Sequence, residues 1–192
     1  MQLETQRLIL REFTPDDVPA VLAYQQTPEY RSLRSTDAYT LEDAQAFVDR
    51  FVGWQQERPR QRFQLAMTLK SHPHLIGTCG IRMQIGAQRI ATIGYELDPE
   101  YWGSGYATES ARRMTEFGFQ DLGLERIEAW CRVDNAASIR VLEKLRLCCE
   151  GQSADSENVP ERWRKYFRFA LLRAEWQVSR ASARPLRTPE ST

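Results

Sequence analysis

The sequence lacks the features that would direct the chain to a nucleic acid, a membrane or an export pathway. Its 192 residues carry 26 basic and 26 acidic side chains, so no net charge attracts nucleic acid or an anionic lipid surface. No apolar run approaches the roughly 18 residues of a membrane span, and the N-terminus has no signal-peptide pattern. These absences predict a cytoplasmic protein with no membrane partner and no direct nucleic-acid partner.

Cysteine and histidine are also few. The cysteines are Cys79, Cys131, Cys148 and Cys149. They lack metal-ligand spacing, and His72 and His74 have no carboxylate or cysteine beside them, so we expect no metal site. No Ser–His or Cys–His pair is apparent that would predict a covalent nucleophile. We interpret the four cysteines as reduced thiols of the protein core.

The stretch from Tyr95 to Glu109 predicts a strand, a tight loop and a helix. Residues 90–97 are rich in β-branched and aromatic side chains, Gly103 and Gly105 permit a sharp turn, and a helical pattern begins at Ala107. Unpaired N–H groups at a helix start favour an anion such as a phosphate or pyrophosphate. The nucleotide-binding patterns G-K-S/T and G-x-G-x-x-G are absent. An ordinary strand–turn–helix connection is the alternative interpretation.

The whole chain predicts one α/β domain with a mixed sheet, flanked by about four helices. A first strand is expected over residues 3–13, an antiparallel meander over 63–97, and a parallel strand over 126–133 that follows a crossover helix. A final hairpin is expected over 147–153 and 162–172. We place the domain at residues 1–178 and expect the Arg-, Ser- and Pro-rich segment 179–192 to be a disordered tail.

The loop also carries a family resemblance. Trp102-Gly103-Ser104-Gly105-Tyr106-Ala107 resembles the R/Q-x-x-G-x-G/A loop of the GCN5-related N-acetyltransferase (GNAT) superfamily, with Trp102 at the position of Arg or Gln. The longer run 100–109 looks most like the RimJ/RimL branch, which acetylates ribosomal-protein N-termini. The resemblance implies central parallel strands that splay apart to admit acetyl-coenzyme A. It also implies these coenzyme A contacts: Leu97, Trp102, Gly103, Ser104, Gly105, Tyr106, Ala107, Thr108, Asn135 and Ser138.

A second resemblance is the N-x-x-S spacing of Asn135 and Ser138 at the start of the following helix. In the family, the Asn contacts the pantetheine arm and the Ser lies near the thioester sulfur. Other branches carry a tyrosine general acid four residues beyond the Ser, where this chain has Leu142, so the resemblance makes Ser138 the proton donor or sulfur contact. The structural alternative is that Asn135 only caps the helix.

We expect Glu96 and Leu97 to serve the chemical step. The Glu96 carboxylate would take the proton of the attacking amine, directly or through water, and the Leu97 N–H would stabilise the oxyanion. The alternative role for Glu96 is a strand carboxylate paired with an arginine. Strand alternation places Glu96 and Leu97 on opposite faces, although a bulge near Gly94 could change this.

These features predict an N-acetyltransferase that uses acetyl-coenzyme A, without metal, in direct attack by a primary amine. The branch resemblance suggests a protein α-amine. A polyamine, amino acid or aminoglycoside acceptor, and a non-catalytic acyl-coenzyme A sensor, stay open, as does a homodimer. Acceptor-pocket candidates are Tyr30, Arg31, Arg34 and Tyr39. Arg146 stands where the family has glycine, and a left-handed backbone there would cost about 1 kcal/mol.

Overall fold

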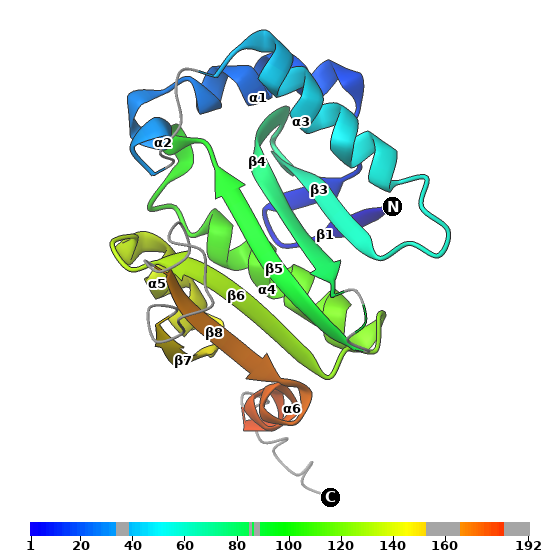
Figure 1. Ribbon diagram of the computed structural model, residues 1–192, viewed down its shortest axis with the longest axis vertical. Coiled ribbons are helices and arrows are strands. Elements are labelled where there is room, and N and C mark those ends of the chain that lie inside the picture. Colours follow the sequence, from blue (N-terminus) through cyan, green and yellow to red (C-terminus); the bar gives the residue numbers. More distant parts are fainter. Residues whose placement is uncertain (34–38, 85, 87–88, 153–165, 183–192) are drawn as a thin grey trace, which may run out of the picture.

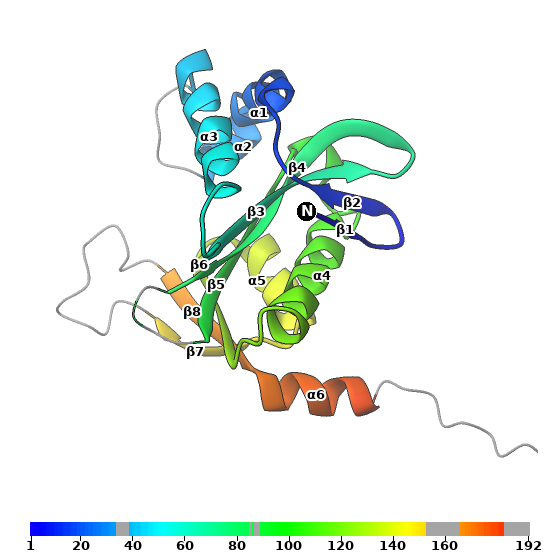
Figure 2. The same cartoon turned by 90° about the vertical axis from the view of Figure 1, so that its right-hand side faces the viewer.

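The computed structural model describes residues 1–33, 39–84, 86, 89–152 and 166–182 (Figure 1). Its strands form one mixed sheet in the order β1-β2-β3-β4-β5-β6-β8-β7. Helices α1–α3 cover one face of this sheet, and α4 and α5 cover the other (Figure 2). The α/β class and the mixed sheet are as predicted. Among the described residues, no helix combines the length and the apolar character of a membrane span.

The strands are β1 Gln2–Glu4, β2 Leu8–Arg11, β3 Arg62–Leu69, β4 His72–Met83, β5 Ile90–Leu97, β6 Arg126–Arg132, β7 Cys148–Gln152 and β8 Tyr166–Leu172. The helices are α1 Val18–Gln25, α2 Pro28–Ser32, α3 Leu41–Trp54, α4 Tyr106–Gln120, α5 Ala136–Lys144 and α6 Arg173–Ser182. The described residues thus form more helices than the four expected. The addition of α6 carries helical structure past residue 178, into the segment expected to be a tail, whereas residues 183–192 lie outside the described part.

The N-terminal segment differs from the single strand expected over residues 3–13. The Leu8 N–H donates to Thr5 Oγ1 at 2.9 Å, and the Thr5 N–H donates to the Leu8 carbonyl at 3.0 Å. These bonds close a turn that divides the segment into β1 and β2, which pair antiparallel. The meander of β3, β4 and β5 is antiparallel as predicted, and so is the final hairpin of β7 and β8.

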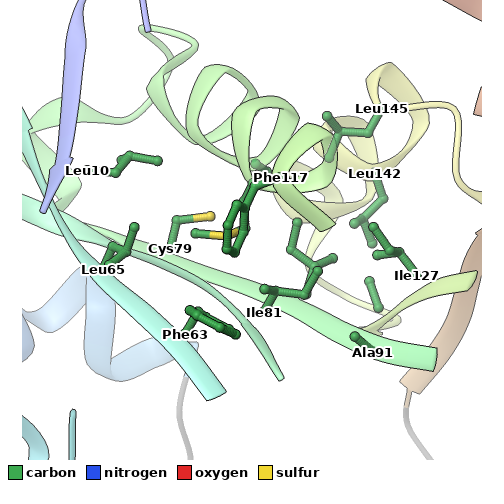
Figure 3. Close-up of a cluster of buried hydrophobic side chains, with 14 of the residues drawn as sticks. Leu10, Phe63, Leu65, Cys79, Ile81, Ala91, Phe117, Ile127, Leu142 and Leu145 are labelled. Atoms are coloured by element: carbon green, nitrogen blue, oxygen red, sulfur yellow. The ribbon is translucent and has the colours of Figure 1, made fainter. Parts of the chain in front are cut away.

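The core lies on both faces of the sheet. Figure 3 shows the larger cluster, in which Phe117 of α4 and Leu142 of α5 face Ile81 and Ile127 of the sheet. A second cluster packs Val21 of α1 and other apolar side chains of α1 and α3 against the opposite face. The amphipathic stripe of each helix therefore fixes which face it covers, because that stripe must leave water.

The expectation that all four cysteines belong to the core is half wrong. Cys79 and Cys131 are buried, whereas Cys148 and Cys149 are exposed. The reason is topological: β7 lies at the edge of the sheet, and each of its residues is exposed. Burial raises the pKa of the Cys79 thiol to about 12, so this thiol stays protonated and acts as a small apolar side chain.

Arg146 occupies the left-handed position that the sequence anticipated, with φ at 64°. It lies just past α5 in a Schellman arrangement, where the Leu147 N–H donates to the Leu142 carbonyl at 3.0 Å and the Arg146 N–H donates to the Glu143 carbonyl at 2.8 Å. The Cβ atom of Arg146 makes this backbone conformation costly. Glycine would avoid that cost at the same position.

We therefore expect Arg146→Gly to stabilise the fold by about 0.5–1 kcal/mol, after allowing for the greater freedom of glycine in the unfolded chain. Urea denaturation measures the change. Arg146→Ala is the matched control, because it removes the same exposed side chain but keeps the Cβ atom. Equal stability of the two variants would show that the left-handed backbone carries no cost here.

Candidate active site

The two central parallel strands pair only at their start. Residues Ile90, Ala91 and Thr92 of β5 pair with Arg126, Ile127 and Glu128 of β6, and the pairing ends there. β5 continues to Leu97 along β4, and β6 continues to Arg132 along β8. The strands therefore part at their C-terminal ends, where ligands enter parallel sheets.

The backbone at Leu97 faces this opening. The neighbouring Asp98 N–H donates to the Ile76 carbonyl of β4 at 2.9 Å. Because successive N–H groups of a strand point to opposite edges, the Leu97 N–H points away from β4, toward the side of β6. The Leu97 carbonyl accepts a hydrogen bond from Trp102 Nε1 at 2.8 Å. Trp102 thus links the end of β5 to the loop that follows.

That loop has the geometry expected of an anion site. Gly103 and Gly105 have φ values of 76° and 82°, and Gly105 is the residue that caps α4. The first main-chain hydrogen bond of this helix runs from the Glu109 N–H to the Gly105 carbonyl, at 3.0 Å. Within the part of the chain that the structure describes, the N–H groups of residues 103–108 have no protein acceptor. They include the backbones of the predicted contacts Ser104, Tyr106, Ala107 and Thr108.

The N-terminal hairpin holds this loop from outside, which the sequence did not reveal. Arg7 Nη1 donates to the Ser104 carbonyl at 3.0 Å, and Arg7 Nε donates to Glu109 Oε2 at 2.7 Å. Thr5 Oγ1 donates to Glu109 Oε1 at 2.6 Å. The Arg7 guanidinium also lies 4.4 Å from the centre of the Tyr106 ring. Residues about a hundred positions apart in sequence thereby fix the start of α4.

Glu109 anchors these contacts as an anion. Its burial raises the pKa of the carboxyl, but the hydrogen bonds from Thr5 and Arg7 together outweigh this, and the net pKa is lowered from 4.5. A lowered pKa in the folded state stabilises the fold above the pKa of the unfolded chain. That contribution is lost as the pH falls through the lower, folded value.

We expect Glu109→Gln to destabilise the fold by about 1–2 kcal/mol at pH 7, because charged hydrogen bonds are weakened. The difference from the unmodified protein should shrink as the pH falls below 4.5. Urea denaturation at pH 7, 5 and 4 measures it. Glu116→Gln on the same helix is the control, since Glu116 forms no ion pair among the described residues and should show little effect. A difference that is constant with pH would contradict the role of the ionised carboxylate.

Asn135 and Ser138 meet at the start of α5, on the other side of the opening. Asn135 Oδ1 accepts the Ser138 N–H at 3.0 Å, so Asn135 does cap the helix. Ser138 Oγ lies 2.8 Å from the hydroxyl of Tyr95, which also donates to the Ser138 carbonyl at 3.2 Å. Tyr95 was not predicted as a site residue. Burial raises the pKa of Tyr95, so its hydroxyl keeps its proton at neutral pH.

Leu142, at the position where other branches carry tyrosine, is buried in the core. The phenol beside Ser138 therefore comes from Tyr95 on a different element, the strand β5.

Glu96 lies on the opposite face of β5 from Tyr95. The register between β4 and β5 is regular from Met83 opposite Ala91 to Gly77 opposite Leu97, so the bulge that could have redirected Glu96 is not found. Tyr30 Oη donates to Glu96 Oε2 at 2.8 Å, and Tyr24 Oη lies 3.4 Å from the same oxygen. Both tyrosines are buried. They orient the carboxylate on the side of the sheet covered by α1–α3.

A cavity of about 570 Å³ opens beside Glu96, between α3 and the strands β3–β5. Of the acceptor-pocket candidates, Tyr39 lines it and Tyr30 reaches the site through its bond to Glu96. Arg31 is exposed and does not line it. Arg34 lies outside the described residues. No residue of α3 was predicted from the sequence as part of the site, although Phe47, Phe51 and Trp54 line the cavity.

The candidate site therefore has two parts, which lie on different sides of the C-terminal end of β5. The loop, Leu97 and the Asn135–Ser138 pair lie along the opening between β5 and β6, and Glu96 with its cavity lies on the face of α1–α3. Of the described residues, no cluster of His, Cys, Asp and Glu could hold a metal ion.

Comparisons with known proteins identify the family. The acetyltransferase (GNAT) domain family matches residues 7–147. The uncharacterized N-acetyltransferase p20 of Bacillus licheniformis is 31% identical over 175 residues, covering 91% of this chain and 97% of that protein.

Solved structures show the same fold. A GNAT-family acetyltransferase of Bacillus anthracis has a TM-score of 0.77 at 26% identity, covering 91% of this chain and all, 100%, of that one. RimJ of Mycobacterium smegmatis, in complex with CoA-disulfide, has a TM-score of 0.73 at 21% identity and covers 94% of each chain; at that identity the likeness concerns the fold alone. From the family match and the relative together, the chain belongs to the GNAT family of acetyl-coenzyme A-dependent N-acetyltransferases.

Proposed function

We propose that this chain transfers an acetyl group from acetyl-coenzyme A to a primary amine by direct attack. One observation carries the proposal. Within the described residues, the N–H groups of 103–108 at the start of α4 have no protein acceptor, and the loop lies next to the parting of β5 and β6. Main-chain amides at the positive end of a helix are suited to a pyrophosphate. The predicted contact residue Trp102 would act indirectly, because its hydrogen bond to the Leu97 carbonyl holds the loop in place.

The opening suits the rest of the co-substrate. Strand-edge N–H and C=O groups of β5 are available to the amides of a pantetheine arm, because β6 has diverged. Asn135 uses its Oδ1 atom in the helix cap, which leaves Nδ2 as the group that would contact the arm. Ser138 lies across the opening, where the sulfur would arrive.

In the chemical step, the amine nitrogen forms a bond to the acetyl carbon and the carbon–sulfur bond breaks. Glu96 accepts the proton that the amine loses, directly or through water. The Leu97 N–H stabilises the negative charge that develops on the carbonyl oxygen. Ser138, paired with the Tyr95 hydroxyl, supplies a proton to the departing thiolate.

The resemblance of the loop to the RimJ/RimL branch supports a protein N-terminal α-amine as acceptor. A small-molecule amine is the second candidate, favoured by the cavity of about 570 Å³ beside Glu96. A sensor that only binds acyl-coenzyme A would need no oriented carboxylate at this place, whereas Glu96 is held by two tyrosines.

A panel assay tests the proposal. Purified protein is incubated with acetyl-coenzyme A and either small amines or N-terminal peptides, and acetylated product is detected by mass spectrometry. Mass detection is preferable to a thiol reagent, because the exposed Cys148 and Cys149 would react with the reagent. We expect acetylation of at least one amine. Tight binding of acetyl-coenzyme A without transfer to any acceptor would favour the sensor.

A further inference from the structure

The cavity beside Glu96 has two chemically different sides. Its α3 side is largely aromatic, and its sheet side is polar and charged. The aromatic side chains are Phe47, Phe51 and Trp54, and the polar sheet residues are Gln64, Arg82 and Glu96. A cavity of about 570 Å³ is in the size range of small-molecule sites.

The guanidinium of Arg82 is held in place by a chain of buried polar groups. Arg82 Nη2 donates to Gln64 Oε1 at 2.7 Å, and Gln64 Nε2 donates to Thr78 Oγ1 at 2.7 Å. Thr78 in turn donates to the Leu65 carbonyl at 2.8 Å. Gln64 and Thr78 are almost fully buried. The cation is therefore a fixed part of the cavity floor rather than a mobile surface side chain.

The Arg82 guanidinium lies next to Gly94 of β5. A Cβ atom built on Gly94 would lie 3.7 Å from Arg82 Nη1, so the guanidinium lies over this glycine. Gly94 and Glu96 share one face of β5, two residues apart, which is roughly 6.5–7 Å along a strand. The fixed cation and the proposed base thus lie on the same side of the cavity, close enough for one small molecule to contact both.

The lining also includes two charged residues of α3, Asp43 and Arg50. Asp43 caps α3, where its Oδ2 accepts the Thr40 N–H at 2.9 Å and the Thr40 hydroxyl at 3.0 Å. Arg50, from the exposed side of α3, adds a second guanidinium to the lining. The lining therefore carries two carboxylates, Asp43 and Glu96, and two guanidiniums, Arg50 and Arg82, and Arg82 is the cation fixed on the sheet side.

We propose that the acceptor is a small amine that carries a carboxylate, with the carboxylate on Arg82 and the amine directed to Glu96. This inference rests on the acetyl transfer proposed above. The planar guanidinium suits a carboxylate through two parallel hydrogen bonds. The aromatic side chains of α3 take an apolar body of the molecule. An α-amino acid with an apolar side chain has all three groups.

The experiment compares matched amines. Phenylalanine, phenylalaninamide and phenethylamine share ring and amine but differ in the carboxylate, and leucine, leucinamide and isoamylamine form a second series. Spermidine and N-terminal peptides complete the panel. We expect each acid to have kcat/KM at least tenfold above its amide. The amide has the more easily deprotonated amine, so amine basicity cannot produce this preference.

The variant Arg82→Gln should raise KM for the two acids at least tenfold. It should leave kcat/KM within about twofold for the uncharged-tail amines, which are the two amides, phenethylamine and isoamylamine. Arg82→Lys, which keeps the charge but not the planar fork, should lie between. Arg168→Gln is the matched control: Arg168 is an exposed arginine of strand β8 that pairs with Glu150 at 3.1 Å and does not line the cavity, so no KM should change.

The outcomes separate the two proposals. Acetylation of peptides, spermidine or the uncharged-tail amines with no preference for any acid overturns the carboxylate inference and leaves acetyl transfer intact. Equal losses for acids and amides in Arg82→Gln also overturn it. Failure to acetylate any amine overturns both. If Arg82→Gln does not fold, the comparison of acids with their amides in the unmodified protein decides alone.

Discussion

Replacement of Glu96 by glutamine should lower kcat by a factor of about 10²–10⁴, the range of a general base. The substitution keeps the shape of the side chain and an acceptor oxygen for the hydroxyls of Tyr24 and Tyr30, but it removes the group that takes the amine proton. Affinity for coenzyme A should stay unchanged, because Glu96 lies on the opposite face of β5 from the α4 loop. Steady-state kinetics with the best acceptor, together with calorimetric titration of coenzyme A, measure both quantities.

Glu100→Gln provides the control. Glu100 is four residues further along and exposed, and its N–H bonds to Asp98 at 3.0 Å, so loss of its charge should leave kcat as it was. If Glu96→Gln turns over at the original rate, the base is another group or solvent. A parallel loss of coenzyme A affinity would instead indicate that the substitution disturbs β5.

Replacement of Gly105 by tryptophan should abolish coenzyme A binding. Gly105 has φ at 82°, a conformation that tryptophan adopts only at a cost. A Cβ atom at this position would lie 3.5 Å from Arg7 Nη2, so the new side chain would also displace the guanidinium that holds the loop, where the diphosphate is proposed to bind. Coenzyme A at a hundred times its Kd should raise the Tm of the unmodified protein by roughly 5–10 °C, and the Tm of the variant by almost nothing.

The strain of a left-handed tryptophan has to be separated from the loss of the site. Gly86 has φ at 78°, in the turn before β5, at the opposite end of that strand from Leu97. Gly86→Trp carries a comparable backbone cost without touching the loop. It should therefore melt lower than the unmodified protein but keep the full ligand-induced shift. A full shift in Gly105→Trp would remove the loop from the coenzyme A site.

Elements with a strong local signal were predictable from sequence. The alternation in β3 and β5, the Thr40 cap of α3 and the glycine loop before α4 each depend on neighbours within a few positions. The left-handed backbone at Arg146 was expected from the family resemblance, which places glycine there. The hairpin of β1 and β2 was missed because its turn is closed by the hydroxyl and N–H groups of Thr5. A single threonine is a weak turn signal in a segment without glycine, proline or asparagine.

The sequence supplied candidate site residues but not the contacts between distant segments. The loop contacts, Asn135 and Ser138 were expected from the family resemblance, and Glu96 and Leu97 from their place at the end of a strand. The loop and Leu97 lie at the parting of β5 and β6, whereas Glu96 faces the cavity on the α3 side. The partners that orient them were not found. Tyr24 and Tyr30 reach Glu96 across more than 60 positions, with sequence separations of 72 and 66, and no periodic pattern records a contact at that distance.

The sequence by itself supplied the candidate residues for the chemical step and the glycine-containing backbone suited to an anion, because both depend on residue type and local conformation. Only the tertiary structure decided where they meet. The parting of β5 from β6, the hold of Arg7 on the loop and the position of Arg82 over Gly94 arise from how whole elements pack. Burial of apolar faces sets that packing, and it is a property of the folded chain rather than of any one segment.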